Sequence, residues 1–121
     1  MKTLRQYADE IQLDQSNPIA LATILSEMSV HYSYLSEQHT AYKLKKAEWE
    51  NKAKFYTMVR DKEIELDKPL SDKAVEQKWR LTTGGGKEYQ MRNDIKVIEK
   101  LMSNLRSILS QRKAEQQNLG Y

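Results

Sequence analysis

The fold is decided by MRNDIKVIEKLMSNLRSIL, residues 91–109, in which apolar side chains recur at alternating steps of four and three. This spacing is the coiled-coil signature, because it keeps one stripe of a helix turned toward a partner helix. Leu101 and Ile108 widen the stripe. The pattern predicts a C-terminal helix over 87–118, packed or oligomerised through Met91, Ile95, Ile98, Met102, Leu105 and Leu109.

A second long helix is predicted upstream, over 18–66. Asn17 suits an N-cap and Pro18 suits the first helical position, and neither glycine nor proline follows until Pro69. The alternative is two shorter helices with a break at 31–36, where Val, Tyr, Ser and His lower the helix propensity.

Shorter elements complete the prediction. One short helix is expected over 3–13 and another over 71–81, the latter capped by Ser71, and the glycine run at 82–86 is expected to be a flexible hinge. The hinge lets the C-terminal helix return antiparallel along the long helix. We therefore predict an all-α fold, a helical hairpin with short extra helices.

Size and composition favour one elongated domain, 1–121. The chain has 121 residues, 31% of them charged, and a mean hydropathy of -0.82, which leaves little apolar material for a compact core. A small, elongated chain buries a modest fraction of its surface. We therefore expect the hairpin to form a homo-oligomer.

Targeting signals are not expected. The chain has no cysteine, so disulfides and thiol chemistry are excluded. The basic start is not followed by an apolar run, and no stretch approaches the roughly 20 apolar residues that span a bilayer. The sequence favours a cytoplasmic protein without a membrane contact.

Charge is distributed unevenly along the chain. The net charge is -3 over residues 1–41 and +7 over residues 42–113, although the whole chain carries only +3. A basic segment of this kind permits an acidic partner, nucleic acid above all.

Aromatic and basic side chains share one face of the predicted long helix. At 100° per residue they fall within about 60° of the Trp49 direction. Rings flanked by cations suit single-stranded DNA, because bases stack on the rings while the cations neutralise phosphates. The candidate contacts are Tyr42, Lys45, Lys46, Trp49, Lys52, Tyr56 and Arg60, with Lys54 on one shoulder.

The same stripe has a structural interpretation. Aromatic residues at heptad spacing are typical of a helix core, with lysines snorkelling from its edges. Duplex DNA would use the cations but would give the rings little to stack on. The sequence leaves core packing and ligand binding open.

Other motifs point away from catalysis. The segment 83–88 lacks the Walker spacing, although Lys87, Arg92 and the free amides of a helix start could hold one phosphate. His31 and His39 lie eight apart without a carboxylate at zinc-site spacing. No nucleophile, base and orienting group occur together, so we expect no enzyme, cofactor or metal.

A family resemblance covers residues 24–60. The segment YSYLSEQHT, residues 32–40, followed by the lysine-rich helix that ends in Lys54-Phe55-Tyr56, resembles the UvsY-type recombination mediators of tailed phages. Those proteins share a Tyr-Ser start, a His seven residues later and a basic helix with an aromatic end. Their Lys-Ala-Arg pattern appears here as Lys52-Ala53-Lys54.

The resemblance implies a ring-forming oligomer that binds single-stranded DNA. Such a protein helps to load a recombinase onto strands coated by single-strand-binding protein, in the host cytoplasm if it is phage-encoded. Lys52 and Lys54 would be the basic contacts. The alternatives are a protein-binding module, such as a virion scaffold or an inhibitor of a host defence protein, and a small architectural protein that prefers duplex DNA.

Overall fold

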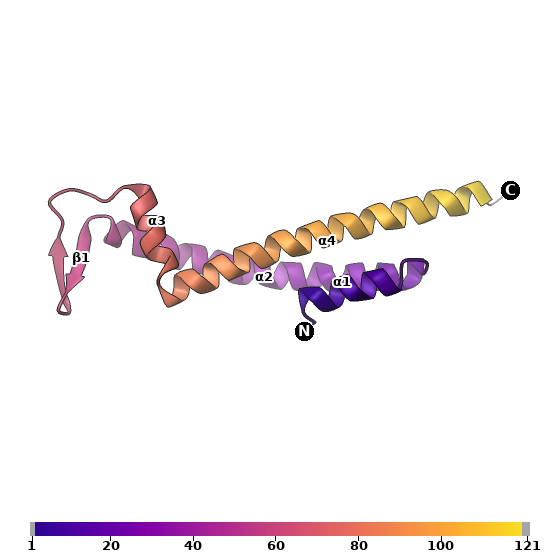
Figure 1. Ribbon diagram of the computed structural model, residues 1–121, viewed down its shortest axis with the longest axis horizontal. Coiled ribbons are helices and arrows are strands. Elements are labelled where there is room, and N and C mark those ends of the chain that lie inside the picture. Colours follow the sequence, from indigo (N-terminus) through magenta and orange to yellow (C-terminus); the bar gives the residue numbers. More distant parts are fainter. Residues whose placement is uncertain (1, 120–121) are drawn as a thin grey trace. The chain divides into compact units, whose positions relative to one another are not determined.

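The computed structural model describes residues 2–119, with side chains for residues 2–115 (Figure 1). This part of the chain is mainly helical, and the long second helix packs on the C-terminal helix, as predicted. A small two-stranded sheet is the only departure from an all-α fold within the described residues. The elements in order are α1 (Leu4–Leu13), α2 (Pro18–Ala53), β1 (Tyr56–Val59), β2 (Lys62–Glu65), α3 (Asp72–Arg80) and α4 (Thr83–Leu119).

The chain forms two compact units where the sequence predicts a single domain. The first, called here the three-helix unit, comprises residues 1–36 and 93–121. The second, the hairpin unit, comprises residues 37–92. Helices α2 and α4 contribute to both units.

Apolar stripes meet in the three-helix unit. Figure 1 shows α1 lying beside the N-terminal half of α2. Tyr32 on α2 donates a hydrogen bond to Glu99 on α4 at 2.9 Å, and Arg112 donates to the carbonyl of Gln15 at 3.1 Å, so the two long helices run antiparallel here. The buried core consists of Tyr7, Ile11, Leu21, Ile24, Met28, Ile98, Met102 and Leu105.

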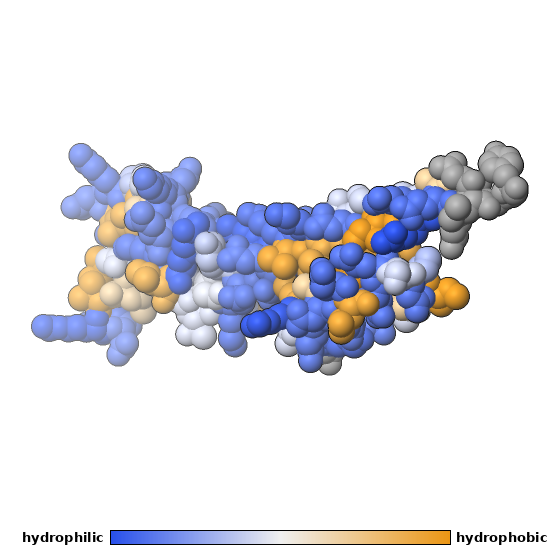
Figure 2. Space-filling view, turned by 45° about the vertical axis from the view of Figure 1, so that its right-hand side comes forward, coloured by the Kyte–Doolittle hydropathy of each residue, from blue (hydrophilic) through white to orange (hydrophobic). Residues whose placement is uncertain are grey.

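The C-terminal stripe predicted from its spacing is therefore used within the chain. Ile98, Met102 and Leu105 are buried, and Met91, Ile95 and Leu109 are half-buried. Hydrophilic side chains cover most of the face seen in Figure 2, and apolar side chains emerge there in patches. The stripe supplies a core without requiring a second copy of the chain.

Side-chain caps set the helix starts. Asn17 accepts a hydrogen bond from the amide of Ala20, and Ser71 accepts one from the amide of Ala74, each at 3.2 Å. These contacts satisfy amides that the first helical turn leaves without partners. The predicted caps are confirmed, and α2 continues through 31–36 without a break.

The predicted end of the long helix at 66 is wrong. Helix α2 ends at Ala53, and β1 pairs antiparallel with β2, Val59 opposite Lys62. The segment 56–65 contains the strand-favouring residues Tyr56, Thr57, Val59 and Ile64, which suit a ribbon better than a helix. Arg60 and Asp61 form the two-residue turn with φ angles of 49° and 63°, as a type I′ turn requires.

The glycine hinge predicted at 82–86 is also wrong. Helix α4 begins at Thr83, so the three glycines lie in its first turn. Thr82 Oγ1 accepts from the amide of Gly85 at 2.9 Å and donates to the carbonyl of Trp79 at 2.7 Å. A Cβ atom on Gly85 would lie 1.6 Å from that carbonyl oxygen. Glycine is needed here for close approach, not for flexibility.

Candidate nucleic-acid interface

The predicted DNA-contact residues do not form one helical line. Tyr42 through Lys52 lie on α2, but Tyr56 lies on β1 and Arg60 lies at the hairpin turn. The helical-wheel argument holds only up to Ala53, where α2 ends. Beyond it, the hairpin decides where the remaining side chains point.

Trp49 is half-buried and packs against Trp79 of α3. The ring centroids lie 5.5 Å apart with an interplanar angle of 51°. Trp79 is buried, at 4% exposure. Part of the Trp49 ring therefore contributes to the core of the hairpin unit, as the packing interpretation expects, and part of it remains accessible.

The accessible part of Trp49 lines a hollow between α2, α3 and the β-hairpin. This Trp49 groove has a volume of about 420 Å³ and is open to solvent. Its walls combine aromatic and aliphatic surface with ammonium groups. The lining residues are Trp49, Lys52, Ala53, Tyr56, Thr57, Met58, Glu63 and Lys78.

The groove joins three predicted residues, Trp49, Lys52 and Tyr56, with others that sequence patterns do not single out. Lys78 on α3 is exposed and makes no ion pair among the described side chains. Met58 is 63% exposed. Only the packing of α3 and the hairpin around α2 reveals that these residues share one surface.

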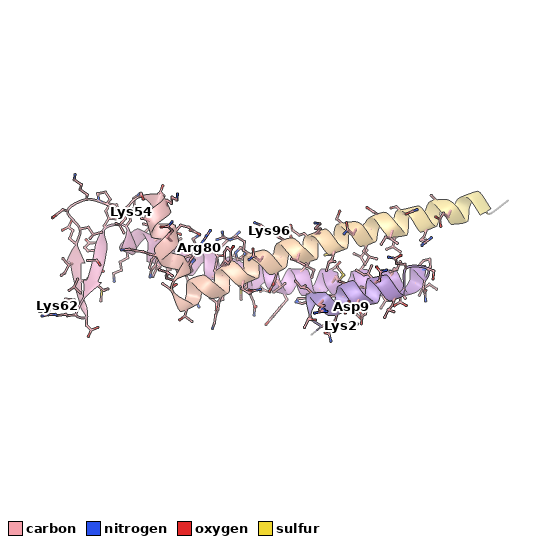
Figure 3. The ribbon with its side chains drawn as sticks, viewed as in Figure 1. Lys2, Asp9, Lys54, Lys62, Arg80 and Lys96 are labelled. Carbon is pink, nitrogen blue, oxygen red and sulfur yellow. The ribbon has the colours of Figure 1, made fainter. Side chains whose placement is uncertain are left out.

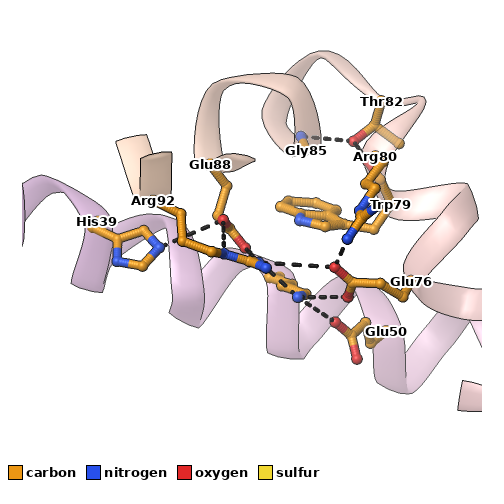
Figure 4. Close-up of polar contacts among 10 residues, drawn as sticks. His39, Glu50, Glu76, Trp79, Arg80, Thr82, Gly85, Glu88 and Arg92 are labelled. Carbon is orange, nitrogen blue, oxygen red and sulfur yellow. Dashed lines mark hydrogen bonds and ion pairs between the residues drawn. The ribbon is translucent and has the colours of Figure 1, made fainter. Parts of the chain in front are cut away.

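Lys46 is directed into the protein. Its Nζ lies 2.6 Å from Glu76, and 3.6 Å from both Glu50 and Glu88 (Figure 4). Burial is the largest single effect and alone would lower the pKa of Lys46, but the hydrogen bond to Glu76 and the negative charges of Glu76 and Glu50 together outweigh it and raise the pKa. The cation is therefore held by three carboxylates and is a poor candidate for binding phosphate.

Glu88 is the centre of this ionic network. The Glu88 side chain is 1% exposed. Arg92 binds it in a bidentate contact, in which Nε and Nη2 each donate a hydrogen bond to one carboxylate oxygen. Burial would raise the pKa of Glu88, but Arg92 and Lys46 outweigh it and hold the pKa below its usual value. The phosphate contact considered for Arg92 is replaced by this internal carboxylate.

The network extends to neighbouring helices. Arg80 lies 3.6 Å from Glu76, and His39 Nε2 lies 3.4 Å from Glu88 without the geometry of a hydrogen bond. Sequence patterns give a partial signal: Glu76 and Arg80, like Glu88 and Arg92, are spaced four apart. Spacing alone does not show that two helices bring these pairs together.

The other predicted cations are more accessible. Lys45 lies over the Tyr42 ring, 5.0 Å from its centroid. Lys54 pairs with Asp72 at 3.3 Å, a carboxylate with a 96% exposed side chain. Arg60 is exposed at the hairpin turn, and Figure 3 shows Lys62 extending from the same end.

Excess positive charge belongs to the hairpin unit. Its residues 37–92 include thirteen basic and ten acidic side chains, whereas the three-helix unit has seven of each. The whole net charge of +3 is therefore carried by the unit that contains the Trp49 groove. A polyanion would be attracted to this unit first.

The described residues contain neither a metal site nor a membrane-spanning helix. No three His, Asp or Glu side chains there are arranged to hold a metal ion. No described helix combines the length and apolar character needed to cross a membrane.

Comparison with protein-family models, curated proteins and solved structures found no match. The resemblance to the UvsY-type mediators therefore rests on residues 24–60 alone.

Proposed function

We propose that the protein binds single-stranded DNA, without sequence specificity, through the Trp49 groove. The observation that carries this proposal is the combination of Trp49 and Tyr56 with Lys52 and Lys78 around one open hollow. Proteins that bind single strands commonly combine stacking rings with cations that follow the backbone. The groove supplies stacking rings and cations within a small set of lining side chains.

Base stacking accounts for the preference for single strands. An unpaired base can place its face on the accessible ring of Trp49 or Tyr56, a contact typically worth about 1–3 kcal/mol. Bases in a duplex are stacked on one another and present only their edges. Duplex DNA would contact the lysines but would not gain the free energy of base stacking on the rings.

Phosphate binding is assigned to the accessible cations. Lys52 and Lys78 line the groove, and Lys45, Lys54 and Arg60, which are accessible cations of the same unit, would supply further phosphate contacts. Lys46 is not expected to bind phosphate, although the sequence suggests it, because three carboxylates surround its ammonium group. Each phosphate neutralised on a single strand contributes about -0.7 to the slope of log affinity against log salt.

The resemblance extends this proposal to a biological role. We propose that the protein acts as a phage-type homo-oligomeric mediator in the cytoplasm, loading a recombinase onto strands coated by single-strand-binding protein. The support for this role is the motif at residues 32–40 and the basic helix after it. Light scattering tests the oligomer, and recombinase loading onto coated single strands tests the mediator role.

A salt titration tests DNA binding directly. Anisotropy of a labelled oligothymidylate should rise at low salt, fall steeply as salt increases, and exceed the response of a duplex of equal length. Lys78→Glu should weaken binding about tenfold, because it reverses a charge at the groove. Lys96→Glu makes the same charge change on the exposed surface of the three-helix unit and should have little effect.

A protein-binding module is the second candidate, favoured by the exposed apolar side chains of the hairpin. Val59 is 46% exposed and Ile64 is 47% exposed on a ribbon of only two strands. Such patches often mark protein interaction sites. The double variant Lys45→Glu with Lys52→Glu separates the candidates, because it should abolish DNA binding and leave an apolar protein contact intact.

A further inference from the structure

One ion pair crosses the Trp49 groove. Lys52 Nζ on α2 lies 3.1 Å from Glu63 Oε1 on β2, and both side chains line the hollow. The Lys52 side chain is 68% exposed and the Glu63 side chain 39% exposed. The pair is therefore accessible to solvent and to a ligand entering the groove.

Two carboxylates share one face of the hairpin, but only Glu63 lines the groove. Glu63 lies opposite Met58, and Glu65 lies opposite Tyr56. Residues two apart on a strand share a face, so both carboxylates belong to the same side of the ribbon. Glu63 lines the groove and pairs with Lys52, whereas Glu65 does not line it.

We propose that Glu63 is an internal competitor that occupies Lys52 until a nucleic-acid phosphate displaces it. This inference rests on the proposed function, since it concerns the regulation of the same groove. A phosphate and the Glu63 carboxylate need the same ammonium group, so strand entry requires the ion pair to open. The chain thereby limits its own affinity for single strands and releases them more readily.

The Lys52–Glu63 ion pair is weak enough to act as a reversible latch, that is, a contact that an entering strand can open and that forms again when the strand leaves. Exposed Lys–Glu pairs contribute little, and the loss of one changes an equilibrium by about two- to fivefold. Such a pair is opened readily by a polyanion whose other phosphates are held by Lys78 and nearby cations. After displacement, Glu63 can turn to solvent because its side chain is already partly exposed.

The test measures oligothymidylate affinity by anisotropy for the full chain. Glu63→Gln should tighten binding about fivefold, because Lys52 is then unoccupied. Glu65→Gln makes the same charge change on the same face and should tighten binding less than about twofold. Glu63→Thr, which retains a strand-favouring side chain, should reproduce Glu63→Gln if circular dichroism shows any loss of fold in the latter.

A double-variant cycle isolates the competition. In a Lys52→Met background, Glu63→Gln should no longer change the affinity, because the contested cation is gone. An equal effect of Glu63→Gln and Glu65→Gln, or an effect that persists without Lys52, overturns the latch while leaving DNA binding intact. Absence of binding by every variant at low salt overturns the proposed function and the latch with it.

Discussion

The three-helix unit and the hairpin unit are each stabilised internally by a different kind of interaction. The first has an apolar core in which Leu21, Met28, Ile98 and Leu105 are fully buried. The second has few buried apolar side chains and is organised by the Trp49–Trp79 contact and the ionic network at Glu88. The apolar core therefore lies in one unit of the chain, and the excess charge, the aromatic surface and the groove lie in the other.

Removing a partner of Glu88 should have the largest effect. Arg92→Met leaves a carboxylate that is 1% exposed without its bidentate cation. Breaking a buried ion pair in this way costs about 3–5 kcal/mol of the free energy of unfolding. Urea denaturation measures the loss.

A paired substitution sharpens that result. Arg92→Met combined with Glu88→Met should be clearly more stable than Arg92→Met alone, since no buried carboxylate is then left without its bidentate partner. Equal stability of the two variants would contradict the assignment of Glu88 as the buried centre of the network.

A cavity in the three-helix unit should cost slightly less. Ile98→Ala removes three carbons from a fully buried position on α4, which typically destabilises a protein by about 2–5 kcal/mol. Val97→Ala, its half-exposed neighbour on the same helix, should change stability by less than about 0.5 kcal/mol. Thermal unfolding followed by circular dichroism separates them.

The glycines at the start of α4 provide a matched comparison in the hairpin unit. Gly85→Ala places a Cβ against the Trp79 carbonyl and should cost about 1–3 kcal/mol through the required backbone shift. Gly86→Ala meets no atom within 4 Å and should be neutral or stabilising, by up to about 1 kcal/mol. Similar stability of the two variants in urea denaturation would restore the flexible-hinge interpretation.

Acid should affect the two units in different pH ranges, with the smallest effects. Burial lowers the pKa of His31 in the three-helix unit below the ordinary 6.5, so the unfolded chain binds the proton more readily. The contribution of neutral His31 to the free energy of unfolding is therefore lost as the pH falls from 6.5 through the pKa of the folded state. His31→Gln should flatten the stability profile over this range, measured by urea denaturation.

Glu88, in the hairpin unit, affects the stability at lower pH than His31 does. Its folded pKa lies below the ordinary 4.5, because Arg92 and Lys46 outweigh the effect of burial. Its contribution is present above 4.5 and is lost as the pH falls through the folded pKa. An unchanged profile below 4.5 in the Glu88→Met, Arg92→Met double variant would argue against this assignment.

Sequence periodicity predicts the three-helix unit well, because its core depends on stripes. The spacing from Ile98 to Leu105 identifies the face that is buried, and Asn17 identifies the start of α2 through a local hydrogen bond. These features depend on residues close in sequence. The antiparallel packing of the two long helices then follows from chain reversal.

The hairpin unit is predicted less well, since its structure depends on contacts between distant residues. Helix-favouring residues in 54–66 conceal a ribbon whose turn places Arg60 and Asp61 at positive φ. Lys46 looks like a ligand contact until Glu76 and Glu88 approach from other helices. The predicted helical face already groups Trp49, Lys52 and Tyr56, but the groove they line forms because α2 ends at Ala53 and the hairpin and α3 supply its other walls.

Tryptophan fluorescence during titration with oligothymidylate tests the central claim most directly. The chain has two tryptophans, and Trp79 is buried, so quenching by stacked bases reports on Trp49. We predict quenching with the same midpoint as the anisotropy change, and its loss in Trp49→Phe, which keeps a ring against Trp79. Binding without quenching, or no binding at low salt, would contradict the assignment of the Trp49 groove as the site for single-stranded DNA.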